Sequence, residues 1–373
     1  MRSNIAGMGF GIVPLALLMG ACTLSPRSYV LTDLGVLPGD TSSEPADINE
    51  SRVIVGFSTG PNGDRAFVWD AAGGMREVGD LPGGAVSSRA NGINDAGQIV
   101  GWSVTWNNAR HAFLYYPGAG QGMRDLGDLP GGADFSHAED IDSSGRVVGT
   151  SMATRTWHAF LWTNGGGLFD LGARALGESE HSEATAINNS GQITGTYVDG
   201  GSFKAFIATS SGSLTRIGPG STGQMSIGFE INNSGEIAGV GSRYLAPNSL
   251  SNVSVAFNSR GVFGDALQDL PGRPAAISAD YSAAHGVNDN GDVVGWSYDS
   301  VGSRAVVWGY MFGLHDLNSR IHSCDPLRNS VVLTEARAIN DNGDIAAVGV
   351  INGQTHAFLL RRSWLGCGRE DPF

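Results

Sequence analysis

The chain has 373 residues, of which 56 are glycine and only 16% are charged, and its formal net charge at pH 7 is −13. An acidic chain repels phosphate backbones and anionic lipid surfaces, which argues against broad nucleic-acid binding. The hydrophobic fraction of 41% is ample for a core, and the glycines follow no three-residue period, so neither general disorder nor a collagen-like helix is expected.

The first 21 residues have the pattern of an export signal. Arg2 provides a positive charge, and the stretch from Ile5 to Ala21 is apolar or small but too short for a comfortable membrane span. Its end, Met19-Gly20-Ala21-Cys22, resembles the lipobox of bacterial lipoproteins. The resemblance implies cleavage before Cys22, lipidation of that cysteine and a lipidated tether over residues 22–28, because two or more acyl chains anchor a protein stably. An ordinary cleaved signal followed by an unrelated cysteine is the alternative.

One unit recurs seven times along the rest of the chain. It is marked by an Ile-Asn pair or a close variant, at spacings of 44 to 56 residues. Glycine usually follows four and eight residues after the isoleucine, and an X-Ala-Phe triplet usually follows after eighteen or nineteen. The pairs that mark repeats 1 to 7 are Ile48-Asn49, Ile93-Asn94, Ile141-Asp142, Ile187-Asn188, Ile231-Asn232, Val287-Asn288 and Ile339-Asn340. A repeat of this length is typical of a propeller blade.

Each repeat predicts four short strands. The first strand ends at the Ile-Asn pair, and the Asn-Asp-x-Gly segment that follows is a tight turn. The second contains the later glycine, whose recurrence suggests a close backbone approach from a neighbouring element. The third contains the X-Ala-Phe triplet, and the fourth follows a glycine-rich turn, as at residues 123–127 and 168–172.

The order of these strands favours a closed ring. A single strand of the fourth type stands at residues 29–35, and the last repeat stops after its third strand at Leu360. If the opening strand completes the last repeat, no edge pair is left open. We therefore expect an all-β fold over residues 29–361: a seven-bladed β-propeller of four-stranded antiparallel blades, closed by the N-terminal strand pairing with the last blade. A C-terminal tail follows at residues 362–373, and an open β array is the alternative.

Three repeated segments together resemble the HAF repeat family of bacterial extracellular proteins. They are the X-Ala-Phe triplet, Ile-Asn-Asp-x-Gly-x-Val-Val-Gly and Asp-Leu-Gly-x-Leu-Pro-Gly-Gly, and the match covers residues 29–361. Four of the seven copies lack the histidine of the triplet. The resemblance implies export and a repeat architecture, and it implies no chemistry, because the family has no established activity.

Two further cysteines, Cys324 and Cys367, lie outside the regular pattern. Exported chains meet an oxidising environment, so we expect a disulfide between them, with two free thiols as the alternative. No metal or other cofactor is expected. The Asn-Asp-Asn-Gly-Asp run at 288–292 superficially resembles a calcium loop but lacks the spacing of an EF-hand, so a hairpin turn is the expectation and calcium the alternative.

Candidate functional residues are few. His111, His158 and His356 occupy equivalent positions of different repeats, so they would stand apart in a ring, and we expect them to be structural. The connections between repeats should gather on one face, and function in repeat folds usually resides where such loops depart from symmetry. The polar residues that we expect in these loops as binding candidates are Asp134, His137, Arg174, Glu178 and His181, with a solvated surface as the alternative. No catalytic residue is assigned, because no triad order, nucleophile elbow or phosphate loop is present.

The sequence therefore predicts an exported, lipid-anchored monomer, at the outer membrane or else periplasmic or extracellular. We expect a non-catalytic binding or scaffold module of the cell envelope whose partner is an envelope protein or a glycan. The alternatives are a polysaccharide-active enzyme with its site in the central channel, and a structural protein without a ligand. Buried carboxylates with shifted pKa values in the channel would favour the enzyme, whereas small side chains there would favour the scaffold.

Overall fold

The computed structural model describes residues 28–118, 122–177, 180–217, 225–244, 252–258, 268–269, 281–299, 302–309 and 313–363. The predicted signal and Cys22, together with Glu178 and Cys367, lie outside these residues. The described chain is almost entirely β, with one short helix, α1 (Leu171–Leu176), and one 3-10 turn, η1 (Leu317–Arg320). None of its helices is long and apolar enough to cross a membrane.

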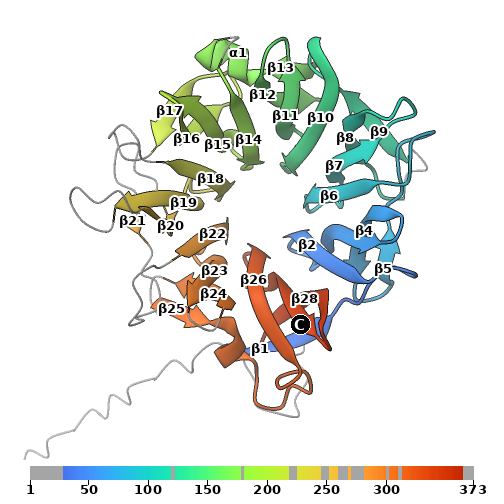
Figure 1. Cartoon of the computed structure of the whole chain (residues 1–373), viewed down its shortest axis with the longest axis vertical. Helices are drawn as coiled ribbons and strands as arrows, with labels where there is room; N and C mark the ends of the chain where they lie inside the picture. The colour runs from blue at the N-terminus through green and yellow to red at the C-terminus, as the bar shows by residue number, and fades with distance from the viewer. Residues whose placement is uncertain are drawn as a thin grey trace, which may run out of the picture.

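The strands form antiparallel sheets arranged in a ring around a central axis, which is an all-β propeller as the sequence predicted (Figure 1). Repeat 1 forms the sheet β2 (Ser42–Ile48), β3 (Ile54–Gly60), β4 (Gly63–Asp70) and β5 (Gly74–Glu77). Repeat 2 forms β6 (Ser88–Ile93), β7 (Ile99–Val104), β8 (Arg110–Tyr115) and β9 (Met123–Gly127). Repeat 3 forms β10 (Gly131–Ile141), β11 (Val147–Ala153), β12 (Trp157–Thr163) and β13 (Gly167–Asp170). One parallel residue pair, Arg110 with Phe135, joins the strands of repeats 2 and 3 into one eight-stranded sheet.

The later repeats follow the same order. Repeat 4 forms β14 (Ser182–Ile187), β15 (Gln192–Asp199), β16 (Ser202–Thr209) and β17 (Leu214–Ile217), and repeat 5 forms β18 (Ser226–Ile231), β19 (Ile237–Tyr244), β20 (Asn252–Asn258) and β21 (Gln268–Asp269). Repeat 6 forms β22 (Tyr281–Val287), β23 (Val293–Asp299), β24 (Gly302–Gly309) and β25 (Gly313–Asp316). Repeat 7 contributes β26 (Val331–Ile339), β27 (Ile345–Ile351) and β28 (Gln354–Ser363), and β1 (Ser28–Asp33) is the fourth strand of their sheet. Strand β1 pairs with β28 from Ser28 opposite Ser363 to Asp33 opposite Phe358.

One predicted strand is partly wrong. The strand expected at 168–172 ends at Asp170, and helix α1 begins at Leu171. The reason is local: the Asp170 carboxylate accepts a hydrogen bond from the backbone N–H of Ala173 at 2.7 Å, which caps the first turn of a helix.

The recurrent glycine of the second strand is explained by a close backbone approach, as expected. A Cβ on Gly101 would lie 2.0 Å from the carbonyl oxygen of Arg89 in the adjacent strand. Repeat 7 carries Ala347 at this position, and its partner strand β26 has an additional register shift between Leu333 and Glu335. The same sheets bury the aromatic ring of the X-Ala-Phe triplet. Its phenylalanines are at most 1% exposed at Phe67, Phe113, Phe160, Phe206 and Phe358.

The Ile-Asn asparagines form a ring of hydrogen bonds around the axis. The side-chain amide of each donates to the backbone carbonyl oxygen of the corresponding residue in the next repeat. The six bonds are Asn49 to Asn94 (3.2 Å), Asn94 to Asp142 (3.0 Å), Asn188 to Asn232, Asn232 to Asn288 and Asn288 to Asn340 (2.9 Å each), and Asn340 to Asn49 (3.1 Å). Asp142 has no amide with which to make the seventh, and its carboxylate pairs instead with the guanidinium of Arg146.

Candidate functional site

A β-bulge interrupts the innermost strand of every repeat, two residues before the Ile-Asn isoleucine. In repeat 1, Pro45 pairs with Gly56 and Asp47 with Val55, so that Ala46 has no partner opposite it. The same shift occurs in the other six innermost strands. The unpaired residues of repeats 1 to 7 are Ala46, Asn91, Glu139, Thr185, Phe229, His285 and Arg337. A bulge redirects a side chain relative to a regular strand.

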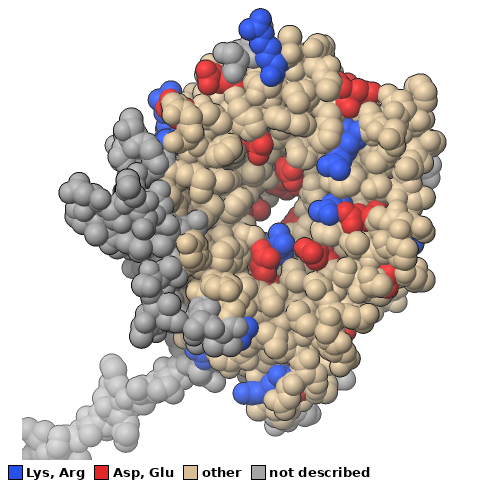
Figure 2. Space-filling view, viewed as in Figure 1, with Lys and Arg blue, Asp and Glu red and all other residues tan. Residues whose placement is uncertain are grey.

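All seven of these bulge residues line one axial cavity of about 360 Å³, which we call the wide cavity. Glu44, Arg89 and Phe57 also contribute to its wall. It lies toward the face at which the innermost strands begin, here called the loop face. Figure 2 shows acidic and basic side chains gathered around a hollow at the centre of the ring.

A second axial cavity of about 170 Å³ lies toward the opposite face, where the innermost strands end in the Asn-Asp-x-Gly turns. We call this the turn face. The wall of the cavity includes Glu50, Asp289 and Asp341 from these turns. The two cavities share Asp47, Asp140 and Glu230, so these three carboxylates form the level between them.

The shared carboxylates also connect neighbouring repeats. Asp47 accepts hydrogen bonds from its neighbour Ile48 at 2.7 Å and from the backbone N–H of Ile93 in repeat 2 at 2.9 Å. Asp140 accepts in the same way from Ile141 at 2.6 Å and from Ile187 in repeat 4 at 2.7 Å. These two side chains therefore stabilise the ring as well as lining the channel.

Burial makes the ionised forms of these groups unfavourable. It raises the pKa of Asp47 to about 6, although the bonds from Ile93 and Ile48 oppose the shift. Burial together with the charge of Asp47 raises the pKa of Asp140 to about 7. Burial and the charges of both aspartates hold the pKa of Glu230 well above its usual range. At neutral pH Glu230 and a fraction of Asp140 therefore keep protons that exposed carboxyls would lose, whereas Asp47 is largely ionised.

The wide cavity holds a further buried carboxyl, Glu139. Burial, with the charge of Glu183, raises the pKa of Glu139 to about 8. Asn91 donates to it at 3.1 Å, and Nδ1 of His137 lies 3.3 Å from its other oxygen. Burial lowers the pKa of His137 to about 4, so both partners are uncharged at pH 7. A neutral carboxylic acid in this position can donate a hydrogen bond or a proton to a ligand.

Basic groups of the wide cavity are held by carboxylates. Nδ1 of His285 lies 2.9 Å from Glu335, and Arg337 lies 3.1 Å from Glu335 and 3.3 Å from Glu44. Burial opposes ionisation of Glu335, but its bond with His285 and the charge of Arg337 outweigh burial and lower its pKa. The ring of Phe229 packs edge-on against the imidazole of His285, with centroids 5.2 Å apart.

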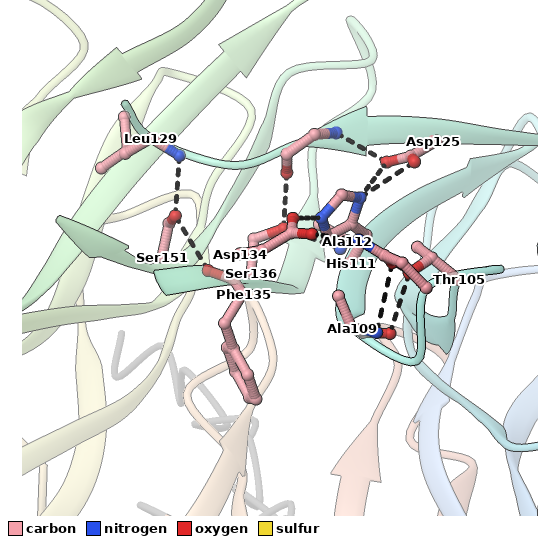
Figure 3. Close-up of polar contacts among 12 residues, drawn as sticks. Thr105, Ala109, His111, Ala112, Asp125, Leu129, Asp134, Phe135, Ser136 and Ser151 are labelled. Atoms are coloured by element: carbon pink, nitrogen blue, oxygen red, sulfur yellow. Dashed lines mark hydrogen bonds and ion pairs between the residues drawn. The ribbon is translucent and has the colours of Figure 1, made fainter. Parts of the chain in front are cut away.

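A separate polar cluster lies on the loop face between β8 and β10 (Figure 3). Nδ1 of His111 is 2.9 Å from both oxygens of Asp125, and Nε2 contacts Asp134. The bond to Asp125 is the main cause that raises the pKa of His111 to about 9, against the effect of burial. Asp128 is close to this pair, and its pKa is raised by burial and by the charge of Asp134. One ligand atom from each of His111, Asp128 and Asp134 lies within 4.8 Å of the others.

The predicted binding residues are not brought together. Asp134 and His137 lie in strand β10 instead of a loop, because that strand starts early, at Gly131. Arg174 lies in helix α1, with its guanidinium 5.3 Å from the ring centroid of Phe169, and His181 pairs with Glu183 at 3.0 Å. Of the four members that the structure describes, Asp134 and His137 take part in clusters with several polar partners.

The triplet histidines each pair with an aspartate of a fourth strand. His158 lies 2.8 Å from Asp170, and His356 lies 2.9 Å from Asp33 of β1. The expected hairpin at 288–292 is present, where Asn288 Oδ1 accepts from the N–H of Asp292 at 2.9 Å. Cys324 is disulfide-bonded, and the predicted partner Cys367 lies outside the described residues.

The channel residues were missed at the sequence level. A signal was present: the residue before the isoleucine is acidic in repeats 1, 3 and 5, at Asp47, Asp140 and Glu230. The residue before that one differs in all seven repeats, although its neighbours recur. These positions are far apart in the sequence, and they form one cavity wall only because the repeats are arranged in a ring.

No protein-family model matches the chain, and no curated protein matches its sequence. Similar solved structures include an oligogalacturonate lyase from Vibrio parahaemolyticus, with 9% identity and a TM-score of 0.56 over 89% of this chain and 93% of that chain. An oligogalacturonate lyase in complex with manganese has 11% identity and a TM-score of 0.54 over 91% and 97%. The β-propeller domain of the Trilobed protease from Pyrococcus furiosus has 7% identity and a TM-score of 0.54 over 89% and 95%. At these identities the likeness shows that the chain has the propeller fold.

Proposed function

We propose that the chain is an exported, lipid-anchored propeller of the HAF repeat type that binds a glycan of the cell envelope, without catalysis, in the wide cavity. One observation carries this proposal. The repeats share most of their turns, glycines and triplet phenylalanines, but all seven place a different side chain at the bulge that lines this cavity. A symmetric scaffold has no need of such variation, whereas an asymmetric ligand does.

We further propose that the propeller has seven blades and that the N-terminal strand closes the ring. The seven sequence repeats support this count. The pairing of β1 with β28 and the bond from Asn340 to Asn49 support closure, because both join the ends of the folded body.

The chemistry of the cavity wall favours a glycan. The bulge residues offer an amide at Asn91, a hydroxyl at Thr185, a carboxyl at Glu139 and an aromatic ring at Phe229. These groups can pair with the hydroxyls of a sugar and cover its apolar face. A cavity of about 360 Å³ is also within the range of small-ligand sites.

The direction of the tether fits this role. Strand β28 begins at the loop face and ends at Ser363, opposite Ser28 of β1, so the N-terminal end of β1 lies toward the turn face. A lipid on Cys22 would then hold the turn face toward the membrane and leave the wide cavity directed away from it.

Binding of the purified mature protein to a glycan array, followed by calorimetry with each hit, tests the proposal. The array should include uronate-containing oligosaccharides, because oligogalacturonate lyases have a similar fold. Phe229→Ala and Asn91→Ala should weaken binding about tenfold or more, a loss of about 1.4 kcal/mol. Arg124→Ala, on the outer strand β9, is the control and should bind normally. The absence of any glycan ligand, or equal binding by all variants, would overturn the proposal.

A polysaccharide-active enzyme is the second candidate. The raised pKa values of the buried channel carboxyls are the observation expected of an enzyme, and two groups of the wide cavity favour it further. His285 is oriented by Glu335 at 2.9 Å, as a general base requires, and Glu139 keeps its proton at neutral pH. Mass spectrometry of oligosaccharides incubated with the protein distinguishes the two candidates. If the protein cleaves an oligosaccharide, and His285→Ala still binds it but no longer cleaves it, the protein is an enzyme. If the oligosaccharide is bound but not cleaved, the protein is a binding module.

A further inference from the structure

We propose that His111, Asp128 and Asp134 form a binding site for one divalent transition-metal ion of the Zn²⁺ or Mn²⁺ class. The site lies on the loop face, where His111 of β8 contacts Asp134 of β10 (Figure 3), and none of the three residues lines either axial cavity. The ligand atoms would be Nε2 of His111 and one carboxylate oxygen from each aspartate, which already lie within 4.8 Å of one another.

The imidazole is held in the orientation that such a site needs. Its Nδ1 lies 2.9 Å from both oxygens of Asp125, which leaves Nε2 directed at Asp134. A carboxylate on the far nitrogen is the usual partner of a metal-binding histidine, because it fixes the ring and makes Nε2 a better ligand. The metal ion would take the place of the proton between Nε2 and Asp134.

Asp134 is oriented from its outer side. The amide of Asn107 donates to Oδ2 of Asp134 at 2.5 Å, and Thr105 donates to Oδ1 of Asn107 at 2.5 Å. This chain of bonds fixes one oxygen of the carboxylate and leaves the other facing the imidazole. The Asp134 side chain is 46% exposed, so it can move outward to admit an ion without disturbing the core.

The arrangement departs from the repeat pattern. His356 also pairs with an aspartate, Asp33, at 2.9 Å. Near His356, the positions that correspond to Asp128 and Asp134 are occupied by Val36 and Thr41. In repeat 3, by contrast, strand β10 starts at Gly131 and pairs with β8 through Phe135 and Arg110, which brings Asp134 to the histidine.

Charge and ligand type indicate the class of ion. Three carboxylates, on Asp125, Asp128 and Asp134, surround a single imidazole, so even a protonated ring leaves the cluster negative. A dication would neutralise it. A nitrogen ligand combined with carboxylates suits zinc or manganese, whereas calcium prefers ligands that are all oxygen. Three protein ligands leave positions for water or for an oxygen of a ligand.

The test is calorimetric titration of the metal-free mature protein with ZnCl₂ and MnCl₂, with CaCl₂ as a comparison. The variants are Asp134→Asn and His111→Arg. Arginine is chosen because Arg65 holds the same position in repeat 1, where it lies 3.1 Å from Glu77 and 2.9 Å from Asp40. It therefore keeps the pairing between strands but supplies no metal ligand. His356→Arg is the matched control, because among the residues that the structure describes His356 belongs to no set of three possible metal ligands.

We expect one ion per chain, about tenfold or more weaker binding in both site variants, and wild-type binding in the control. Zinc should also raise the melting temperature of wild type and His356→Arg but not of Asp134→Asn. The proposal is overturned if wild type binds neither Zn²⁺ nor Mn²⁺ more tightly than about 1 mM. It is equally overturned if Asp134→Asn and His111→Arg bind as wild type does, or if His356→Arg loses as much affinity as they do.

Discussion

The side-chain amide of Asn340 donates to the backbone carbonyl oxygen of Asn49 at 3.1 Å, across 291 residues of sequence. This bond joins the last repeat to the first by the same contact that joins most other neighbours around the ring. Its donor and acceptor are both buried, so neither can turn to water when the bond is lost. One substitution at this contact should therefore weaken the junction between the first and the last repeat.

Replacing Asn340 with Asp should destabilise the protein by about 1–3 kcal/mol, because it removes the donor and places a carboxylate beside the carbonyl oxygen of Asn49. Urea unfolding followed by circular dichroism measures the loss. Asn164→Asp is the control, because Asn164 is an exposed residue that accepts a hydrogen bond from Arg124. If Asn164→Asp loses as much stability as Asn340→Asp, the hydrogen bond from Asn340 to Asn49 does not account for the loss.

The exception at Asp142 makes a complementary prediction. Arg146 pairs with the buried Asp142 carboxylate, whereas repeats 2 and 4 have Asn94 with Gln98 and Asn188 with Gln192 at these positions, each amide donating to the glutamine at 2.7 Å. Arg146→Gln alone leaves a buried charge without its cation and should cost about 3 kcal/mol. Adding Asp142→Asn should recover most of that stability by restoring the amide pair.

The matching experiment is a double-mutant cycle in urea. A coupling energy of about 1 kcal/mol or more is expected. Additive losses in the double variant would contradict the compensation between Asp142 and Arg146.

Repetition explains what the sequence could predict. The Ile-Asn turns, the glycines and the X-Ala-Phe rings solve the same packing problem in each repeat, so their spacing indicated strands, turns and a propeller. The wide cavity could not be found in that way, because Asn91, Glu139 and His285 belong to different repeats and meet only across the ring. The bulge that turns them inward is a register shift, and no single residue marks it. Asp134 was placed in a loop because nothing in its surroundings showed that β10 would extend to meet β8.

Gly101→Ala should be strongly destabilising, by about 3 kcal/mol or more. The added Cβ would lie 2.0 Å from the carbonyl oxygen of Arg89, and a backbone atom in a sheet cannot move away cheaply. Gly165→Ala is the matched control, because a Cβ there meets nothing within 4 Å. Thermal unfolding of both variants checks the difference, and a Gly101→Ala protein as stable as the control would show that the strands can separate locally.

The disulfide of Cys324 should link it to Cys367. The chain has three cysteines, so one bond between this pair leaves Cys22 for the proposed lipid. Peptide mapping by mass spectrometry under non-reducing conditions should recover a peptide that joins the two. Reduction should lower the stability by about 2–4 kcal/mol. A bond between Cys324 and Cys22 would refute both the pairing and the lipid anchor.

The buried carboxyls of the channel should make the protein less stable as the pH rises from about 4 to about 8. Their pKa values in the folded protein are raised, to about 6 for Asp47, about 7 for Asp140 and about 8 for Glu139. Between their ordinary values and these raised values the folded state binds more protons than the unfolded state, so the free energy of unfolding falls with increasing pH. Below about pH 3 these carboxyls are largely protonated in both states and contribute little pH dependence.

Glu139→Gln isolates one of these groups. Glutamine can still accept the hydrogen bond from Asn91, and it has no charge to bury, so the decrease in stability from pH 5 to pH 8 should be smaller than in wild type. The titratable neighbours of Glu139 named above, Glu183 and His137, remain in the variant. Urea unfolding at a series of pH values measures the difference, with Glu77→Gln on the outer strand β5 as the control for loss of one carboxylate. If the Glu139→Gln and wild-type curves run parallel, Glu139 ionises in the folded protein as it does in the unfolded chain, and its proposed role as a neutral hydrogen-bond donor in the wide cavity fails with it.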